Sequence, residues 1–262
     1  MKKLFLTVLS VVMLLCLTAC SSGFLSDGDI MNVTEEQNPT VTINLEYDPE
    51  DGGGKREVEL VFELYYSKAP STVTNFVQLI NKEYYNNKIV HYATGNGGDT
   101  SELEYISAGQ YYYDDEGDLV NDSVGYQIKG EFQSNQWDAN DLTHTLGALA
   151  MDRLSGSGAV FDSAASAFYI VLNENVERDG NYCVFGNIVS SSVTLDGKQL
   201  GTAEGLHNQF LNDMLNIDNS GTETTKDGKT TVQNMPAFTI TITSVTVDTH
   251  GIDYDSAKVA KV

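Results

Sequence analysis

Short stretches in which apolar and polar residues alternate are the feature that most limits what this chain can fold into. The alternation is clearest in 40–48, 57–66 and 235–249. Successive side chains of a β-strand point to opposite faces, so a period of two predicts half-buried strands. The glycine-rich segment between the first two stretches predicts a hairpin. Further short strands are predicted at 88–93, 103–109, 125–132, 147–153, 166–172 and 182–189.

A helical period replaces the alternation in 67–85 and again in 205–217. Apolar residues there recur three or four positions apart: Val73, Phe76, Val77 and Ile80 in the first stretch, and Leu206, Phe210 and Met214 in the second. Pro70 falls in the first helical turn, where its missing N–H costs no hydrogen bond. Many short strands with one helix near each end predict a mainly β fold, a closed antiparallel barrel whose mouths are capped by the helices. The segment 221–231 is expected to be a flexible loop.

The N-terminus predicts export. Lys2 and Lys3 precede an apolar stretch, 4–17, that is too short for a comfortable membrane span. It ends in Leu-Thr-Ala-Cys at 17–20, which resembles the lipobox of bacterial lipoproteins. We therefore expect a signal peptide at 1–19, a lipid on Cys20, a flexible acidic tether over 20–39, and a location on the extracytoplasmic face of a membrane. The alternative is an ordinary signal peptide with an incidental cysteine.

Charge and cysteine content limit the partners and the source of stability. The chain has 15 Lys and Arg against 37 Asp and Glu, a formal net charge of −22, which argues against nucleic acid or an anionic lipid surface as the main partner. Beyond Cys20 the single remaining cysteine is Cys183, so no intramolecular disulfide is expected and stability must come from a core. We expect one domain over 40–249 and a frayed polar tail over 250–262.

No metal or cofactor is predicted. The histidines at 91, 144, 207 and 250 are widely spaced and none pairs with another at ligand spacing. The acidic stretch 114–122 lacks the glycine and the terminal glutamate of an EF-hand loop, and is read as a solvated turn. The sequence also lacks a nucleophile elbow, a P-loop and a dinucleotide fingerprint.

Several blocks of the sequence resemble those of one protein family. "VELVFELYYSKAPSTVTNFVQLINKEYYNNKIVH" resembles the opening of a cyclophilin-type peptidyl-prolyl isomerase domain, and "GYQIKGEF", "HTLGALAMDR", "SAFYIVL" and "DGNYCVFGNIV" resemble later blocks of that family in the same order. The resemblance covers about 57–249. It implies an eight-stranded barrel with two capping helices, cis-trans isomerisation of X-Pro bonds without a cofactor, and proline-containing segments of exported proteins as partners.

The resemblance also implies which residues form the site. The family's catalytic arginine falls on Tyr92, and its glutamine falls on Ser107 if 94–103 is an insertion. His91 matches a histidine with a structural role and is predicted to pack. Tyr105, Phe168 and Tyr169 are expected to hold the proline. The remaining substrate-binding candidates are Arg153, Glu177 and Tyr182.

Two functions remain open at this point. The first is an isomerase that assists the folding of exported proteins, with Tyr92 in the place of the arginine. The second is a catalytically weak or inactive peptide-binding or scaffold lipoprotein that uses the same groove. A solute-binding lipoprotein is disfavoured because the chain lacks two similar α/β lobes.

Overall fold

The computed structural model describes residues 23–49, 51–93 and 103–262, and these form a mainly β domain with two α-helices. The helices are α1 (Pro70–Asn81) and α2 (Asn208–Leu215). The strands are β1 (Thr40–Tyr47), β2 (Arg56–Leu64), β3 (Val90–Ala93), β4 (Tyr105–Ala108), β5 (Tyr111–Tyr113), β6 (Leu119–Asn121), β7 (Ala148–Met151), β8 (Phe168–Val171), β9 (Val184–Leu195), β10 (Lys198–Glu204), β11 (Gly221–Thr224), β12 (Thr231–Met235) and β13 (Thr241–Asp248).

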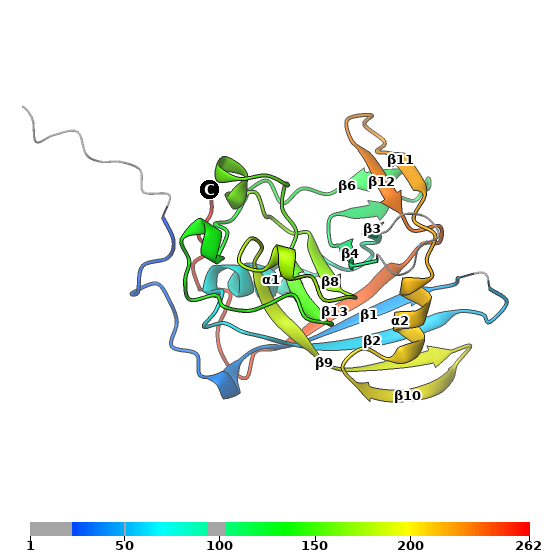
Figure 1. Cartoon of the computed structure of the whole chain (residues 1–262), viewed down its shortest axis with the longest axis horizontal. Helices are drawn as coiled ribbons and strands as arrows, with labels where there is room; N and C mark the ends of the chain where they lie inside the picture. Colours follow the sequence, from blue (N-terminus) through cyan, green and yellow to red (C-terminus); the bar gives the residue numbers. More distant parts are fainter. Residues whose placement is uncertain (1–22, 50, 94–102) are drawn as a thin grey trace, which may run out of the picture.

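Eight strands form one curled antiparallel sheet in the order β13-β1-β2-β9-β7-β8-β4-β3, and β10 pairs with β9 (Figure 1). The expected closed barrel is not formed, because no continuous ladder joins the end strands β3 and β13. An isolated bridge between Ile89 and Thr241 is the closest approach to one. Backbone hydrogen bonds from Asn87 N to Ile242 O and from Val90 N to Ile240 O accompany this bridge, but they do not form a ladder between β3 and β13. The sheet is therefore an open half-barrel.

Both predicted helices are present and bury the predicted faces. On α1, Val73, Phe76 and Val77 are fully buried, and the Phe76 ring lies 5.1 Å from the Phe185 ring across the core. On α2, Phe210 and Met214 are fully buried. The side chain of His207 caps α2 by accepting a hydrogen bond from Gln209 N at 3.1 Å.

The start of α1 is capped by a buried carboxylate that the sequence did not single out. Glu131 accepts hydrogen bonds from Ser71 N at 2.9 Å, from Thr72 N at 2.8 Å and from Thr72 Oγ1 at 2.8 Å. These bonds satisfy N–H groups that have no partner inside the helix. Burial outweighs the hydrogen bonds and raises the pKa of Glu131 to about 7.

Two predicted segments have a different local structure. Residues 125–132 form no strand, since Ile128 makes only isolated bridges to Ala164 and Lys261. The expected loop 221–231 is the hairpin β11–β12, which turns through 225–230. The Asp227-Gly228 pair, with Gly228 at φ 69°, supplies the left-handed residue that this turn needs.

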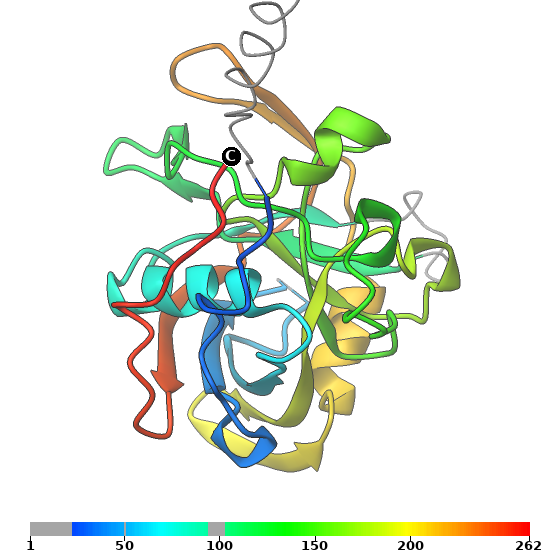
Figure 2. The same cartoon turned by 90° about the vertical axis from the view of Figure 1, so that its left-hand side faces the viewer.

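The two terminal segments pack on the domain. Of the expected tether, Ile30, Met31 and Val33 lie against the core, and Met31 N donates to the Tyr66 hydroxyl at 2.9 Å. The expected frayed tail is also held, because Tyr254 is 1% exposed and lies beside Tyr66. The two segments run side by side in Figure 2 and are joined by the ion pair of Lys258 with Asp29.

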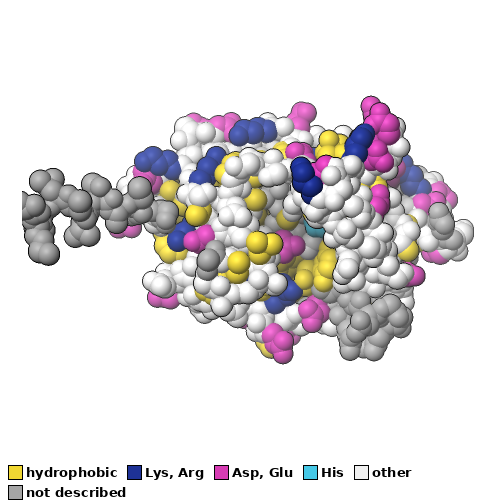
Figure 3. All heavy atoms as spheres, turned by 90° about the horizontal axis from the view of Figure 1, so that it is seen from above, with side chains coloured by type: hydrophobic (Ala, Val, Ile, Leu, Met, Phe, Trp, Pro, Cys, Tyr) yellow, Lys and Arg dark blue, Asp and Glu magenta, His cyan; other side chains and the backbone are white. Residues whose placement is uncertain are grey.

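Acidic and basic side chains lie close together on the surface. The face in Figure 3 shows both signs in small groups around a hollow that contains hydrophobic side chains. Ion pairs such as Lys129–Asp162, at 2.7 Å, bring the two signs into contact. Among the described residues, no helix is long and apolar enough to cross a membrane.

Candidate active site

Four tyrosines gather on the face of the sheet opposite α1. Tyr92 comes from β3, Tyr105 from β4, Tyr169 from β8, and Tyr182 lies just before β9. Neighbouring ring centroids lie 5.9 Å apart for Tyr92 and Tyr105, 4.7 Å for Tyr105 and Tyr169, and 6.2 Å for Tyr169 and Tyr182. We call these residues the tyrosine cluster. Tyr105 and Tyr169 are buried, whereas Tyr92 and Tyr182 keep part of their surface exposed.

Phe168 does not belong to this cluster, so its expected contact with proline is wrong. It precedes Tyr169 on β8 and therefore points to the other face of the sheet. There it is 1% exposed and packs edge-on against Phe76, with ring centroids 5.4 Å apart. Phe168 is a core residue beneath α1.

Tyr92 and Ser107 lie on paired strands at the edge of the cluster. Ser107 is opposite Tyr92 on one side and opposite Tyr169 on the other. Its side chain is fully buried, and its hydroxyl has no hydrogen-bond partner of normal geometry in the part of the chain that the structure describes. It is near enough to Asp152 to favour that carboxylate's ionised form. In this position Ser107 does not reach a peptide on the surface. Tyr92 does present an exposed edge.

Arg178 is the residue of the site that the sequence reasoning missed. It ends the short helix η5 (Val176–Arg178), and its guanidinium carbon lies 4.2 Å from the Tyr105 ring centroid, 4.5 Å from that of Tyr182 and 5.3 Å from that of Tyr169. Its Nη2 donates to the Tyr105 hydroxyl at 2.6 Å. A guanidinium over aromatic faces is an electrostatically favourable arrangement. The cluster therefore carries a positive charge at its surface.

A buried chain of hydrogen bonds supports the cluster from below. His144 Nδ1 lies 2.8 Å from Asp179 Oδ1, and His144 Nε2 lies 2.8 Å from the Tyr169 hydroxyl. Burial lowers the pKa of His144 against the opposing effect of Asp179, so the ring is neutral at neutral pH. With Nδ1–H donated to Asp179, Nε2 accepts the Tyr169 O–H. No spacing in the sequence pointed to this triad, because its members come from three separate segments.

Arg153 and Glu177 contribute less to the surface than expected. The Arg153 guanidinium donates to the backbone oxygens of Asn181 and Leu154 at 2.8 and 2.7 Å, while lying 4.2 Å from the Tyr182 ring centroid. Its donors are therefore committed to the fold. Glu177 is exposed on η5, where its N–H donates to the Asn175 side chain.

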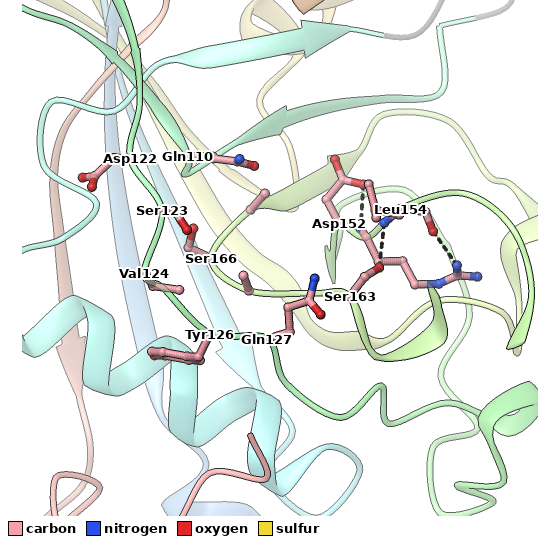
Figure 4. A pocket seen from close by; sticks show the side chains of 13 residues that line it. Gln110, Asp122, Ser123, Val124, Tyr126, Gln127, Asp152, Leu154, Ser163 and Ser166 are labelled. Carbon is pink, nitrogen blue, oxygen red and sulfur yellow. Dashed lines mark hydrogen bonds between the residues drawn. The ribbon is translucent and has the colours of Figure 1, made fainter. Parts of the chain in front are cut away.

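A pocket of about 310 Å³ lies beside the cluster (Figure 4). Its walls come from 110–127 on one side and 152–167 on the other. Asp152 lines it, and burial raises the pKa of this carboxyl. Asp122 lies across the pocket and pairs with Lys88 at 2.8 Å. Because Asp152 directly precedes Arg153, the pocket and the tyrosine cluster are neighbouring parts of one surface.

His91 packs, as predicted. It is 6% exposed, and its ring lies 4.7 Å from the Tyr111 ring. Burial lowers its pKa to about 4, so it is neutral at neutral pH. It shares β3 with Tyr92, but it lies at the register shift between Val90 and Tyr92 and packs on Tyr111, outside the tyrosine cluster.

The acidic turn carries a lysine at its centre. The carboxylates of Asp114, Glu116 and Asp118 lie close enough together to share one ion. Lys226 Nζ lies 2.6, 2.7 and 3.4 Å from them, respectively. The ammonium group neutralises part of this charge and ties the turn to the β11–β12 hairpin.

Comparison with known sequences places this chain in a family. Residues 53–222, more than half of the chain, match the model of the cyclophilin type peptidyl-prolyl cis-trans isomerase/CLD family. A peptidyl-prolyl cis-trans isomerase of Acinetobacter baylyi is 30% identical over 139 residues, which cover 51% of this chain and 63% of the relative. Peptidyl-prolyl cis-trans isomerase B of Bacillus subtilis is 29% identical over 145 residues, 50% of this chain and 77% of the relative.

Solved structures give a more distant likeness. A crystal structure of a cyclophilin type peptidyl-prolyl cis-trans isomerase from Cryptosporidium parvum, in the presence of the dipeptide ala-pro, is 19% identical. The match covers 80% of this chain and 98% of that one, with a TM-score of 0.46.

Proposed function

The chain belongs to the cyclophilin-type peptidyl-prolyl cis-trans isomerase family, and from this premise we propose that it accelerates rotation about X-Pro bonds in peptide segments bound over the tyrosine cluster. The observation that carries the proposal is the cluster itself. Tyr92 and Tyr182 offer part-exposed aromatic faces, which suit a proline ring, beside a pocket large enough for a neighbouring side chain.

The reaction requires no covalent bond to be made or broken by the protein. The peptide bond resists rotation by about 18–20 kcal/mol because the nitrogen lone pair is delocalised into the carbonyl. Uncatalysed X-Pro isomerisation therefore takes roughly tens to hundreds of seconds. A surface that binds the twisted amide better than either planar isomer lowers this barrier. A shallow apolar groove that fixes the proline ring and leaves the preceding residue free to turn would meet this requirement.

The test is a cis-to-trans assay on a short X-Pro peptide, with the purified full chain in detergent. We expect acceleration by the wild type, a loss of at least about tenfold in Tyr182→Ala, and wild-type activity in Tyr65→Ala. Tyr65 is a part-exposed tyrosine outside the cluster and is the matched control. No acceleration by a folded wild type would refute the enzymatic proposal.

A non-catalytic peptide-binding module is the second candidate. Two observations favour it: Tyr92 is neutral where the family resemblance implies arginine, and Ser107 is buried where it implies glutamine. This candidate predicts peptide binding without acceleration, measurable by titration of a fluorescent X-Pro peptide. It also predicts that Tyr92→Arg gains activity over a silent wild type, because the variant restores the cation at the implied position.

We further propose that the domain works outside the cytoplasm, tethered by a lipid on Cys20, with exported proteins as clients. The support is the sequence of 1–20, which lies outside the described residues, and the strongly acidic composition. Cys20→Ser should abolish incorporation of labelled palmitate and release the protein from the membrane fraction. Retention of the variant in that fraction with full labelling would contradict the anchor.

A further inference from the structure

Arg178 places a guanidinium against the rings of the tyrosine cluster. We propose that Arg178 is the catalytic cation of this protein, donating an N–H to the prolyl nitrogen of the twisted X-Pro bond. It would do so from η5, on a different segment from the β3 position that Tyr92 occupies. The assignment rests on the proposed isomerase function.

The chemistry asks for a fixed donor of this kind. When the X-Pro bond twists, conjugation is lost and the lone pair becomes localised on the prolyl nitrogen. That nitrogen then accepts a hydrogen bond that it accepts poorly in the planar isomers. A donor held beside it therefore stabilises the twisted state more than the ground state. No covalent bond is made or broken, and no proton is transferred.

Arg178 has donors to spare and a fixed position. A guanidinium has five N–H groups in one plane. Its hydrogen bond from Nη2 to the Tyr105 hydroxyl uses only part of this set. Contacts with three rings restrain the plane, yet the side chain stays partly exposed, so the remaining N–H groups can meet a peptide.

The other two arginines of the chain are committed elsewhere. Arg153 donates to backbone oxygens of Leu154, Gly156 and Asn181. Arg56 is 3% exposed and lies between Asp51 and Asp213, beside α2. Of the three guanidinium groups, Arg178 is thus the one with unassigned donors facing the tyrosine cluster.

The buried triad explains why Arg178 keeps this place. Asp179 holds the His144 ring through Nδ1, and His144 Nε2 takes the Tyr169 O–H. The Tyr169 ring is thereby fixed in place, with its centroid 5.3 Å from the Arg178 guanidinium carbon. Tyr169 and His144 are therefore positioning residues, which act on the reaction through Arg178.

The experiment compares Arg178→Met, Arg178→Lys and Lys229→Gln with the wild type in the full chain. Lys229 is exposed and pairs with Asp227, outside the cluster. Lys229→Gln therefore removes one positive charge without changing the cluster. We expect Arg178→Met to lower kcat by about 100-fold with little change in peptide affinity, as for loss of one transition-state donor. Arg178→Lys should be intermediate, because it keeps the charge and loses the planar fork. Lys229→Gln should match the wild type.

A double-mutant cycle tests the positioning role. Tyr169→Phe should lower kcat by itself but cause no further loss in an Arg178→Met background, since it acts through the guanidinium. Circular dichroism confirms that each variant is folded. If the wild type is active and the folded Arg178→Met variant is equally fast or faster, the assignment of Arg178 is overturned and the isomerase function stands. The guanidinium would then have no part in the reaction, or would hinder it. A silent wild type would overturn the proposed function and this assignment together.

Discussion

Glu131 is a carboxylate placed where water does not reach it. It is 1% exposed, and its three hydrogen bonds all come from the first turn of α1. An anion at a helix N-terminus is favoured by the helix dipole and by the free N–H groups. Even so, burial raises its pKa from 4.5 to about 7, so the domain binds this proton more tightly than the unfolded chain does.

That difference makes stability depend on pH. Below pH 4.5 the carboxyl is protonated in both the folded and the unfolded chain, and its full contribution to the free energy of unfolding is present. As the pH rises to about 7, the unfolded chain releases the proton first, so the free energy of unfolding falls by on the order of 3 kcal/mol. Urea unfolding at pH 5 and pH 8 should show this loss in the wild type relative to Glu131→Gln.

The comparison with Glu131→Gln is needed because His91 acts in the opposite direction. Its pKa is lowered to about 4, so it favours the folded state above pH 6.5 and destabilises it as the pH falls. The variant retains His91, and the difference between the two proteins isolates Glu131. A difference that is the same at both pH values would contradict the prediction.

Individual site residues were predictable only where their neighbours in sequence decide their role. The packing of His91 followed from its match to a structural histidine of the family, and the family resemblance also named Tyr105, Tyr169 and Tyr182 as parts of one site. Arg178 was not recognised as a site residue, because its role depends on contacts with rings from other segments. The His144 triad escaped for the same reason, since Asp179 and Tyr169 reach it from other segments.

At the scale of elements, periodicity predicted the helices and the long strands. It failed for 125–132, where alternation exists but no neighbouring strand supplies a ladder. It also failed for 221–231, whose threonines pair across a tight turn. A pattern shows which face of a segment can be buried, whereas pairing depends on a partner strand that is often distant in the sequence, as β13 is for β1.

The C-terminal segment is the element that departs most from expectation, and Tyr254 anchors it. Gln78 Nε2 donates to Tyr254 O at 2.7 Å and to Ala257 O at 2.9 Å, so the segment is tied to α1. Tyr254→Ala should lower the free energy of unfolding by about 3–5 kcal/mol, as for other large aromatic truncations in cores. Denaturant titration measures the change.

Tyr254→Phe is the matched control. The Tyr254 hydroxyl is buried without a hydrogen-bond partner among the described residues, so its removal should leave stability unchanged or increase it. If alanine proved harmless, the segment would contribute nothing to the fold. If phenylalanine were as damaging as alanine, the hydroxyl would have a partner that this structure does not give it.

For the whole molecule, the class of fold followed from the sequence but the closure of the barrel did not. Alternating strands and two amphipathic helices define a curled sheet around one core. Among the described residues, the two edges meet over 87–90 and 240–242, through an isolated bridge and a few backbone hydrogen bonds that do not form a ladder. No pattern in the sequence reports how far two distant strand ends pair.

The docked N-terminal segment can be followed through the single tryptophan of the chain. The Phe24 and Trp137 rings lie 4.9 Å apart, and Trp137 Nε1 donates to Lys68 O at 2.8 Å. Phe24→Ala should make Trp137 fluorescence more sensitive to acrylamide, because it removes the ring that covers the indole. Ser26→Ala, an exposed change in the same segment, should not. Equal quenching in all three proteins would show that the segment is undocked in solution.

This docking sets how far the domain can stand from a bilayer. With the lipid proposed for Cys20, the anchor would be four residues from Phe24, whose ring packs against Trp137. At a full extension of about 3.6 Å per residue, four residues span roughly 14 Å. A twenty-residue tether would have let the groove sample the surrounding volume in every orientation. Under the proposed lipidation, the short leash would keep one side of the domain turned to the membrane, so its clients would be chains that emerge close to the lipid surface.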